Sequence, residues 1–257
     1  MTIFYFTSTG NSLAVAKKIG GGSAAYISIP QIIDNPSLLY KDGVIGVVYP
    51  IYGFGLPKMV RRFFEKVKWE ADYAFAIGTY GNLPGAAARN TQFLAQEQGL
   101  RLDYSTTLLM VDNYLPGFEV NDQIAKLPVK KPDENLARII ADITDHKPLD
   151  APAGLGWRAA TAAIKAAEKA FMNNTRNYIV DEKCTKCGTC AKVCPAANIT
   201  VIDKVTFSDK CEWCLGCVHL CPKNALHMKN EKSAARWRHP DVTLTEIIKA
   251  NDRTVTQ

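Results

Sequence analysis

All eight cysteines of this 257-residue chain fall in one short segment, and they form two runs of one pattern, C-x-x-C-x-x-C-x-x-x-C-P. The runs begin 27 residues apart, at Cys184 and Cys211. Thiolates at this spacing ligate iron–sulfur clusters. Three on one turn can hold one face of a [4Fe-4S] cube, and the second copy supplies the fourth sulfur. The cysteines are Cys184, Cys187, Cys190 and Cys194 in the first run and Cys211, Cys214, Cys217 and Cys221 in the second.

Two other uses of these cysteines fit less well. A disulfide framework is typical of small secreted chains, but residues 1–183 contain no cysteine and the N-terminus has no basic export signal. A zinc site takes two C-x-x-C pairs, which leaves the third cysteine of each run and the C-P ending unexplained. The spacing therefore favours iron–sulfur clusters.

The repeat resembles a bacterial two-cluster ferredoxin, in which the fourth cysteine of each run ligates the cluster of the other run. Carried over to this chain, the resemblance implies two ligand sets. The first-run cluster would take Cys184, Cys187, Cys190 and Cys221, and the second-run cluster would take Cys211, Cys214, Cys217 and Cys194.

The N-terminal half alternates apolar strand patterns with amphipathic helix patterns. This alternation predicts an α/β fold with a doubly wound, parallel, five-stranded sheet. The expected strands are Ile3–Phe6, Ala25–Ile29, Val44–Tyr49, Tyr73–Thr79 and Tyr104–Asp112, and the expected helices are Leu13–Ile19, a helix opened by Pro57, one within Gly85–Gly99 and Pro132–Asp145.

Ligands of such sheets bind beyond the carboxyl ends of the strands, so the loops there are the candidate site. A hydroxyl-rich loop at a helix N-terminus suits a phosphate, and aromatic, glycine-bearing loops suit a flat ring. Together they predict FMN. The predicted FMN residues are Thr7, Ser8, Thr9, Gly10, Asn11, Ser12, Pro50, Ile51, Tyr52, Gly53, Phe54, Thr79, Tyr80, Gly81, Asn82 and Tyr114.

The first half resembles a flavodoxin-like domain, whose phosphate loop T-x-T-G-x-[ST] is matched by Thr7, Thr9, Gly10 and Ser12. With the cysteine repeat behind it, the chain resembles the flavodoxin and ferredoxin fusion proteins of anaerobic bacteria and archaea. The resemblance implies that Tyr52, Phe54, Tyr80, Gly81, Asn82 and Tyr114 line the flavin ring. Flavodoxins often stack a tryptophan there, whereas these loops contain none and only one acidic residue, Asp112.

We divide the chain into a flavodoxin-like domain (1–146), a linker with a bracing helix over Trp157–Met172 (147–180), a ferredoxin domain (181–228) and a tail with a short helix (229–257). Short strands from 199–207 and 225–228 should cover the clusters. His219 is expected to be exposed or bonded to sulfur rather than to iron. The Arg236-Trp237-Arg238 cluster is expected to dock on the chain's own surface or to meet an acidic redox partner.

Charge and hydropathy limit the classes of partner that the chain is expected to have. The formal charge of +6 is offset by bound clusters and phosphate, at about −2 each, so no nucleic-acid partner is expected. The longest apolar stretch is broken by glycine and proline, so no membrane span is expected either. With no export signal, a cytoplasmic location is expected.

Three functions remain open. The favoured one is an electron carrier that joins FMN to two low-potential clusters and exchanges electrons with redox partner proteins. The second is an FMN-dependent reductase of a quinone or nitro compound, with Tyr52, Tyr80 and Tyr114 as candidate proton donors. The third is an interaction module with structural clusters and no flavin.

Overall fold

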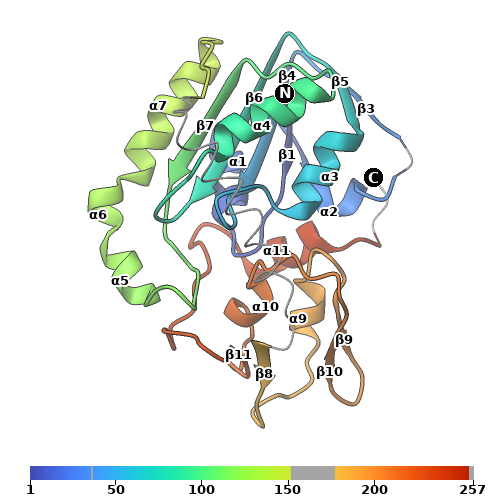
Figure 1. The fold of residues 1–257 in the computed structure, drawn as a ribbon, viewed down its shortest axis with the longest axis vertical. Coiled ribbons are helices and arrows are strands. Elements are labelled where there is room, and N and C mark those ends of the chain that lie inside the picture. The colour runs from blue at the N-terminus through green and yellow to red at the C-terminus, as the bar shows by residue number, and fades with distance from the viewer. Residues whose placement is uncertain (36, 152–176, 255–257) are drawn as a thin grey trace.

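The computed structural model describes residues 1–35, 37–151 and 177–254. Its centre is a five-stranded sheet in the order β2-β1-β4-β6-β7, with all neighbours parallel (Figure 1). Numbered along the chain, this is the order 2-1-3-4-5 of the flavodoxin-like fold, which confirms the predicted class. The strands are β1 (Thr2–Tyr5), β2 (Ala25–Ser28), β4 (Val44–Pro50), β6 (Tyr73–Tyr80) and β7 (Tyr104–Leu109).

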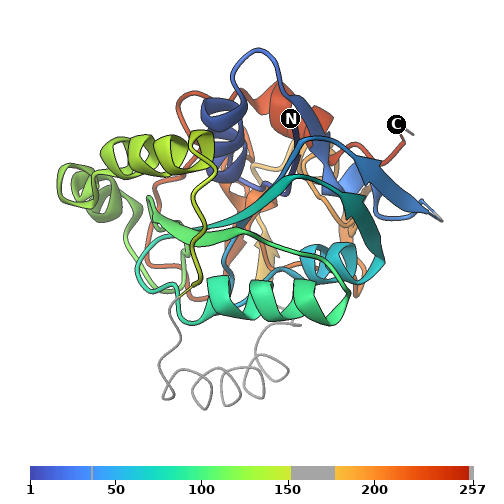
Figure 2. The same ribbon diagram turned by 90° about the horizontal axis from the view of Figure 1, so that it is seen from above.

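Helices cover both faces of the sheet (Figure 2). Helices α1 (Asn11–Gly20) and α7 (Pro132–Thr144) lie on one face, and α3 (Lys58–Lys66) and α4 (Ala87–Glu97) lie on the other. In α3 the spacing of Met59, Val60, Phe63 and Phe64 puts all four on the buried side. Pro57 stands just before this helix, as its N-cap.

Several short elements were not predicted. Strands β3 (Leu38–Lys41) and β5 (Val67–Glu70) form a separate parallel pair, and α2 (Ile29–Ile32) follows β2. The polar stretch between β7 and α7 contains α5 (Val120–Ala125) and α6 (Leu127–Lys130). These elements are only four to six residues long, which is too short for a periodic pattern to be recognised in the sequence.

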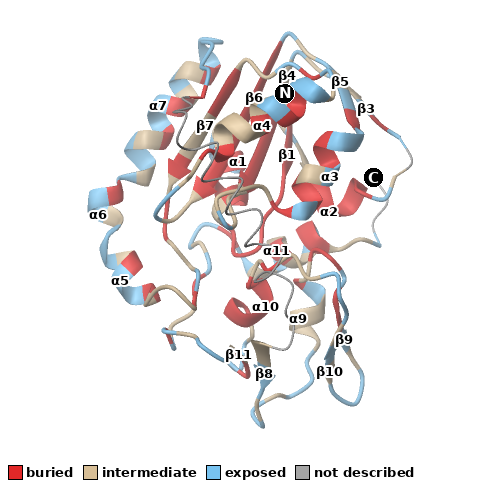
Figure 3. Ribbon diagram, in the orientation of Figure 1, coloured by how far each residue is buried: buried red, intermediate tan, exposed pale blue. Residues whose placement is uncertain are grey.

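The cysteine segment lies beyond the carboxyl ends of the sheet strands (Figure 1). Its cysteines surround two short helices, α9 (Thr189–Lys192) and α10 (Gly216–His219). Antiparallel pairs β9–β10 (Ile199–Val201, Val205–Phe207) and β8–β11 (Tyr178–Val180, Leu226–Met228) flank them, as predicted for 199–207 and 225–228. Figure 3 shows that burial is concentrated in the sheet and in α10, whereas the β9–β10 turn is exposed.

The C-terminal tail ties the two halves together. Helix α11 (Leu244–Asn251) begins with the predicted capping box of Thr243 and Glu246. At its other end, the Asn251 amide donates to the carbonyl oxygens of Thr7, in the sheet domain, and Val193, in the cysteine segment. The expected bracing helix over 157–172 lies outside the described residues. Within the described chain this tail is one of the segments that join the halves.

Candidate functional site

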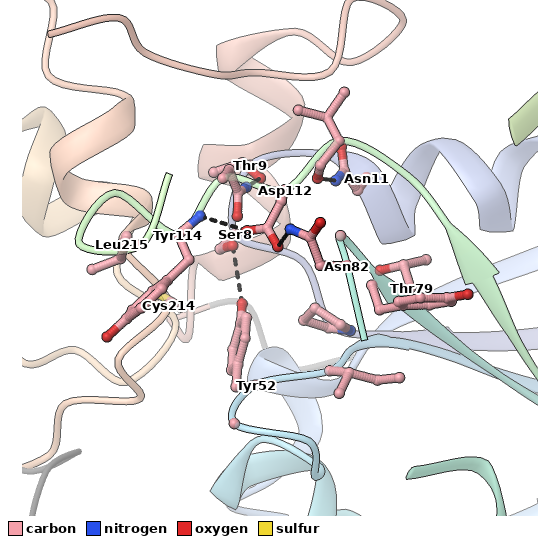
Figure 4. A pocket seen from close by; sticks show the side chains of 18 of the residues that line it. Ser8, Thr9, Asn11, Tyr52, Thr79, Asn82, Asp112, Tyr114, Cys214 and Leu215 are labelled. Atoms are coloured by element: carbon pink, nitrogen blue, oxygen red, sulfur yellow. Dashed lines mark hydrogen bonds between the residues drawn. The ribbon is translucent and has the colours of Figure 1, made fainter. Parts of the chain in front are cut away.

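The predicted loops enclose one cavity of about 420 Å³, which we call the loop cavity (Figure 4). Its size lies within the range of roughly 300–1,000 Å³ that is usual for cofactor sites. Fifteen of the sixteen predicted FMN residues line it, and Gly10 does not. The lining residues outside those sixteen are Leu83, Val111, Asp112, Asn113, Gly117, Phe118, Trp213, Cys214 and Leu215.

The loop from Thr7 to Ser12 leads directly into the N-terminus of α1. Gly10 is the N-cap and is left-handed, with φ of 102°, a conformation that favours glycine. No side chain caps the helix, so its first N–H groups and the helix dipole are oriented to receive an anion. Gly10 thus shapes the loop from behind rather than lining the cavity.

A tight turn after β4 brings Tyr52 to the loop from Thr7 to Ser12, which we call the phosphate-type loop. Gly53 and Phe54 both have positive φ, and the backbone groups of Tyr52 and Gly55 exchange two hydrogen bonds, as in a type I′ turn. The Tyr52 hydroxyl lies 3.0 Å from Ser8 Oγ (Figure 4). Burial raises the pKa of Tyr52 well above its usual value, so this hydroxyl stays neutral.

The loops after β6 and β7 pack against each other. A Cβ on Gly81 would lie 2.2 Å from the Cβ of Asp112, so only glycine fits. The Asn82 amide donates to the Asp112 carboxylate at 2.6 Å (Figure 4). Lys130, at the end of α6, donates to the carbonyl oxygens of Gly81 and Met110 at 2.6 and 2.8 Å.

The fourth wall of the loop cavity comes from the cysteine segment. Trp213, Cys214 and Leu215 all line the cavity, and Figure 4 shows Cys214 and Leu215 beside Tyr114. Trp213 and Leu215 have positive φ, and a Cβ on Gly216 would lie 3.2 Å from the Ser8 carbonyl oxygen. The tryptophan missing from the sheet loops is therefore supplied by the second cysteine run.

Each predicted set of four cysteines surrounds one small cavity. Cys184, Cys187, Cys190 and Cys221 line what we call the first cysteine cavity. Cys194, Cys211, Cys214 and Cys217 line the second cysteine cavity. This is the grouping that exchange of the fourth cysteine predicts; ligation itself stays a prediction.

The sulfur environments suit iron–sulfur clusters. Backbone N–H groups of Asn198, Trp213 and Ala225 each lie 3.3 Å from a cysteine sulfur, in the manner of hydrogen bonds that stabilise thiolates. Burial acts in the opposite direction, because it raises the pKa of Cys214 and Cys217 well above the usual range, with a smaller contribution from nearby thiolates, and so disfavours their thiolate forms. Among the described residues, no group of three or more His, Cys, Asp or Glu side chains forms a site for a single metal ion.

The loop cavity and the second cysteine cavity adjoin, and the first cysteine cavity lies beside the second, where α9 packs against α10. Cys214 and Leu215 line both the loop cavity and the second cysteine cavity. Cys190, from the first cysteine cavity, lies close enough to Cys217 in the second to raise the pKa of its thiol further. The order is therefore loop cavity, second cysteine cavity, first cysteine cavity.

The predictions for His219 and for the Arg–Trp cluster had different outcomes. His219 is buried, accepts a hydrogen bond from the Trp237 backbone N–H and donates to the Asn113 carbonyl oxygen, so the expectation of exposure or sulfur bonding was wrong. Burial lowers its pKa to about 4, which keeps the imidazole neutral. The buried Trp237 donates to Asn11, which confirms docking on the chain's own surface.

Residues 176–222 match the family model of the 4Fe-4S dicluster domain. The cysteine segment is therefore similar to a 4Fe-4S dicluster domain. Joined to the flavodoxin-like sheet, this domain confirms the predicted fusion of the two architectures. Comparison with curated protein sequences gives no significant match.

Solved structures similar to the chain include two with low overall superposition. A putative flavoprotein from Bacteroides uniformis ATCC 8492 has a TM-score of 0.33 and 17% identity, over 42% of this chain and 89% of that one. The Trp repressor binding protein from Bacillus subtilis has a TM-score of 0.29 and 14% identity, over 43% of this chain and 83% of that one. Within residues 1–35, 37–151 and 177–254, no helix has both the length and the apolar character needed to cross a membrane.

Proposed function

We propose that the chain is an electron-transfer protein that binds FMN in the loop cavity and one [4Fe-4S] cluster in each cysteine cavity. The single observation that carries the proposal is the position of Cys214. This predicted cluster ligand lines both the loop cavity and the second cysteine cavity. When bound, FMN exchanges one or two electrons and a cluster exchanges one, so the pair converts between the two kinds of chemistry.

The residues of the loop cavity fit FMN rather than a bare flavin. The uncapped N-terminus of α1 favours an anion, and the hydroxyls of Thr7, Ser8, Thr9 and Ser12 surround it with polar groups. Tyr52, Tyr80 and Trp213 provide flat walls for a ring. The phosphate end and the ring end thus lie in one continuous cavity.

The electron carrier is favoured over the FMN-dependent reductase because one wall of the loop cavity is formed by the second cysteine run. A small acceptor needs room over the ring and a proton donor beside it. Tyr52 is bonded to Ser8, and burial raises its pKa, so it is a poor acid. Reduced holoprotein that turned over quinones or nitroaromatic compounds faster than free FMN does would favour the reductase.

Anaerobic purification with cofactor counting tests the proposal. We expect about eight iron atoms, eight sulfides and one FMN per chain, from two Cys₄ sites and one phosphate loop. Stoichiometric zinc would overturn the cluster assignment, and full iron without flavin would overturn the FMN assignment.

A pair of substitutions at Trp213 tests whether the second cysteine run forms a wall of the FMN site. Trp213→Ala should weaken FMN binding about tenfold, since an aromatic contact contributes on the order of 1 kcal/mol. Trp213→Phe keeps a flat ring and should retain most of the affinity. Iron content should stay equal in both variants. Unchanged FMN affinity in the alanine variant would show that the ring does not pack against Trp213.

A further inference from the structure

The first cysteine cavity is lined by residues of β8, β9, β10 and β11. These strands lie at the end of the molecule farthest from the sheet (Figures 1 and 3). Cys187 is exposed there. The second cysteine cavity, by contrast, lies against the sheet domain through Cys214, and its Cys217 is buried. Of the two proposed clusters, the first is therefore the more accessible to another protein.

Lysines surround the mouth of the first cysteine cavity. Lys186 and Lys223 line it, and the exposed Lys192 lies on α9 beside it. Within the described chain none of these three makes an ion pair, and no Asp or Glu lines this cavity. The nearby carboxylate of Asp181 is already bonded to His227.

Exposed apolar side chains accompany these lysines. Ile179 and Val180, on β8, are 44% and 36% exposed, and Ile202, in the β9–β10 turn, is 75% exposed. Val180 lines the first cysteine cavity, and Ile202 follows Val201, which also lines it. Apolar residues gathered at the surface and rimmed by charge mark protein interaction sites.

The negative charge of a bound cluster does not by itself explain why lysines line the first cysteine cavity. The second cluster carries the same charge of about −2, yet its cavity is lined by Glu212 and, among the described residues, by no lysine. Among the described residues, lysines line the first cysteine cavity and not the second. Cluster charge alone would call for lysines at both cavities.

We propose that this surface, which we call the lysine rim (Lys186, Lys192, Lys223, Ile179, Val180 and Ile202), docks a redox protein with an acidic surface. The docking follows from charge and apolar exposure, and the electron exchange rests on the proposed function. With a cluster held by the first-run set of cysteines, one electron would pass between it and the partner's redox centre, one being oxidised as the other is reduced, and no bond would be made or broken. The second cysteine cavity lies on the side of the first that faces the sheet domain, and the loop cavity adjoins the second.

Binding of a probe protein to the anaerobic holoprotein tests the lysine rim. The probe is an acidic flavodoxin, and basic cytochrome c serves as the opposite-charge control. Calorimetry should show flavodoxin binding that weakens about tenfold between 50 and 300 mM NaCl, because salt screens opposite charges. Tighter binding of cytochrome c than of flavodoxin would overturn the proposal.

A matched set of variants locates the binding. The triple variant K186Q/K192Q/K223Q should weaken flavodoxin binding about tenfold, and K186R/K192R/K223R should retain it. The control K41Q/K68Q/K126Q removes the same charge from the sheet domain and should change affinity less than twofold. Equal losses in the rim and control variants would overturn the proposal.

The Ile202→Ser variant and the FMN content of the chain separate failure of the docking proposal from failure of the proposed function. Ile202→Ser, at an exposed turn, should weaken binding with full iron content, whereas unchanged affinity would remove the apolar part of the rim. Binding to the rim does not require FMN, so a chain without flavin would refute the proposed function while these titrations still decide the docking site.

Discussion

Replacing Lys130 with methionine should destabilise the sheet domain and weaken FMN binding together. Lys130 is 7% exposed, and its ammonium group donates to Gly81, Met110 and Gln123 at 2.6, 2.8 and 3.1 Å. Burial lowers its pKa, so the group is held charged at neutral pH only at a cost in desolvation. The three acceptors offset that cost.

The expected loss follows from those bonds. A hydrogen bond to a charged group contributes about 1.5–3 kcal/mol, and the methionine variant leaves two carbonyl oxygens without their donor while removing the desolvation cost. We expect a net loss of about 3 kcal/mol, or roughly 6–12 °C in melting temperature for a chain of this size. Loosening of the Gly81 loop should raise the FMN dissociation constant about tenfold.

Thermal unfolding and FMN titration of the holoprotein measure both effects. Lys126→Met, an exposed lysine one turn earlier, is the matched control and should change neither quantity. A Lys130→Met variant within 1 kcal/mol of the wild type would show that the ammonium group does not hold the loop. If the variant lost stability but kept its FMN affinity, Lys130 would stabilise the fold without supporting the FMN site.

Three other substitutions test the site at separate points. Gly81→Ala should abolish FMN binding with full iron content, as measured by cofactor counting, because its Cβ would clash with Asp112 at 2.2 Å. Cys194→Ala should remove about four of eight iron atoms, and adding Cys211→Ala should remove no more; further loss would refute their shared cavity. Glu246, whose pKa is lowered to about 2 chiefly by Lys17, contributes stability that is present above about pH 4.3 and lost as pH falls toward 2. The melting difference between wild type and Glu246→Gln should therefore be constant from pH 5.5 to 8, and a change in that interval would contradict the assignment.

Local sequence patterns were enough to predict the sheet and the two cysteine runs, whereas the grouping of the cysteines into two sets came from the resemblance to two-cluster ferredoxins. A buried strand such as Val44–Pro50 is a continuous apolar run, and an amphipathic helix such as α3 repeats its large residues at helical spacing. The cysteine spacing likewise belongs to one contiguous segment. In each case the residues that make the structure are close in sequence, so their pattern is visible without the fold.

The short elements α5 and α6 were not predicted because they bury little. Their buried residues are Val120, Gln123 and Lys130, of which two are polar. A buried lysine has no sequence signature, since a lysine in a polar, proline-punctuated stretch is ordinarily exposed. Its burial is made favourable only by three acceptors, which come from the loop after β6, from Met110 just after β7, and from α5.

Trp213 shows the same limit at the site itself. The sequence places it between two cluster ligands, where its local role is to cover a cluster, and the four sheet loops contain no tryptophan. It reaches the loop cavity only because the second cysteine run packs on the phosphate-type loop, with Gly216 against Ser8 and Asn251 joining Thr7 to Val193. A site that two segments complete only after they dock cannot be read from either alone. Because of the same docking, Cys214 lines both the loop cavity and the second cysteine cavity, so the tail and α10 help to fix the spacing of these two cavities.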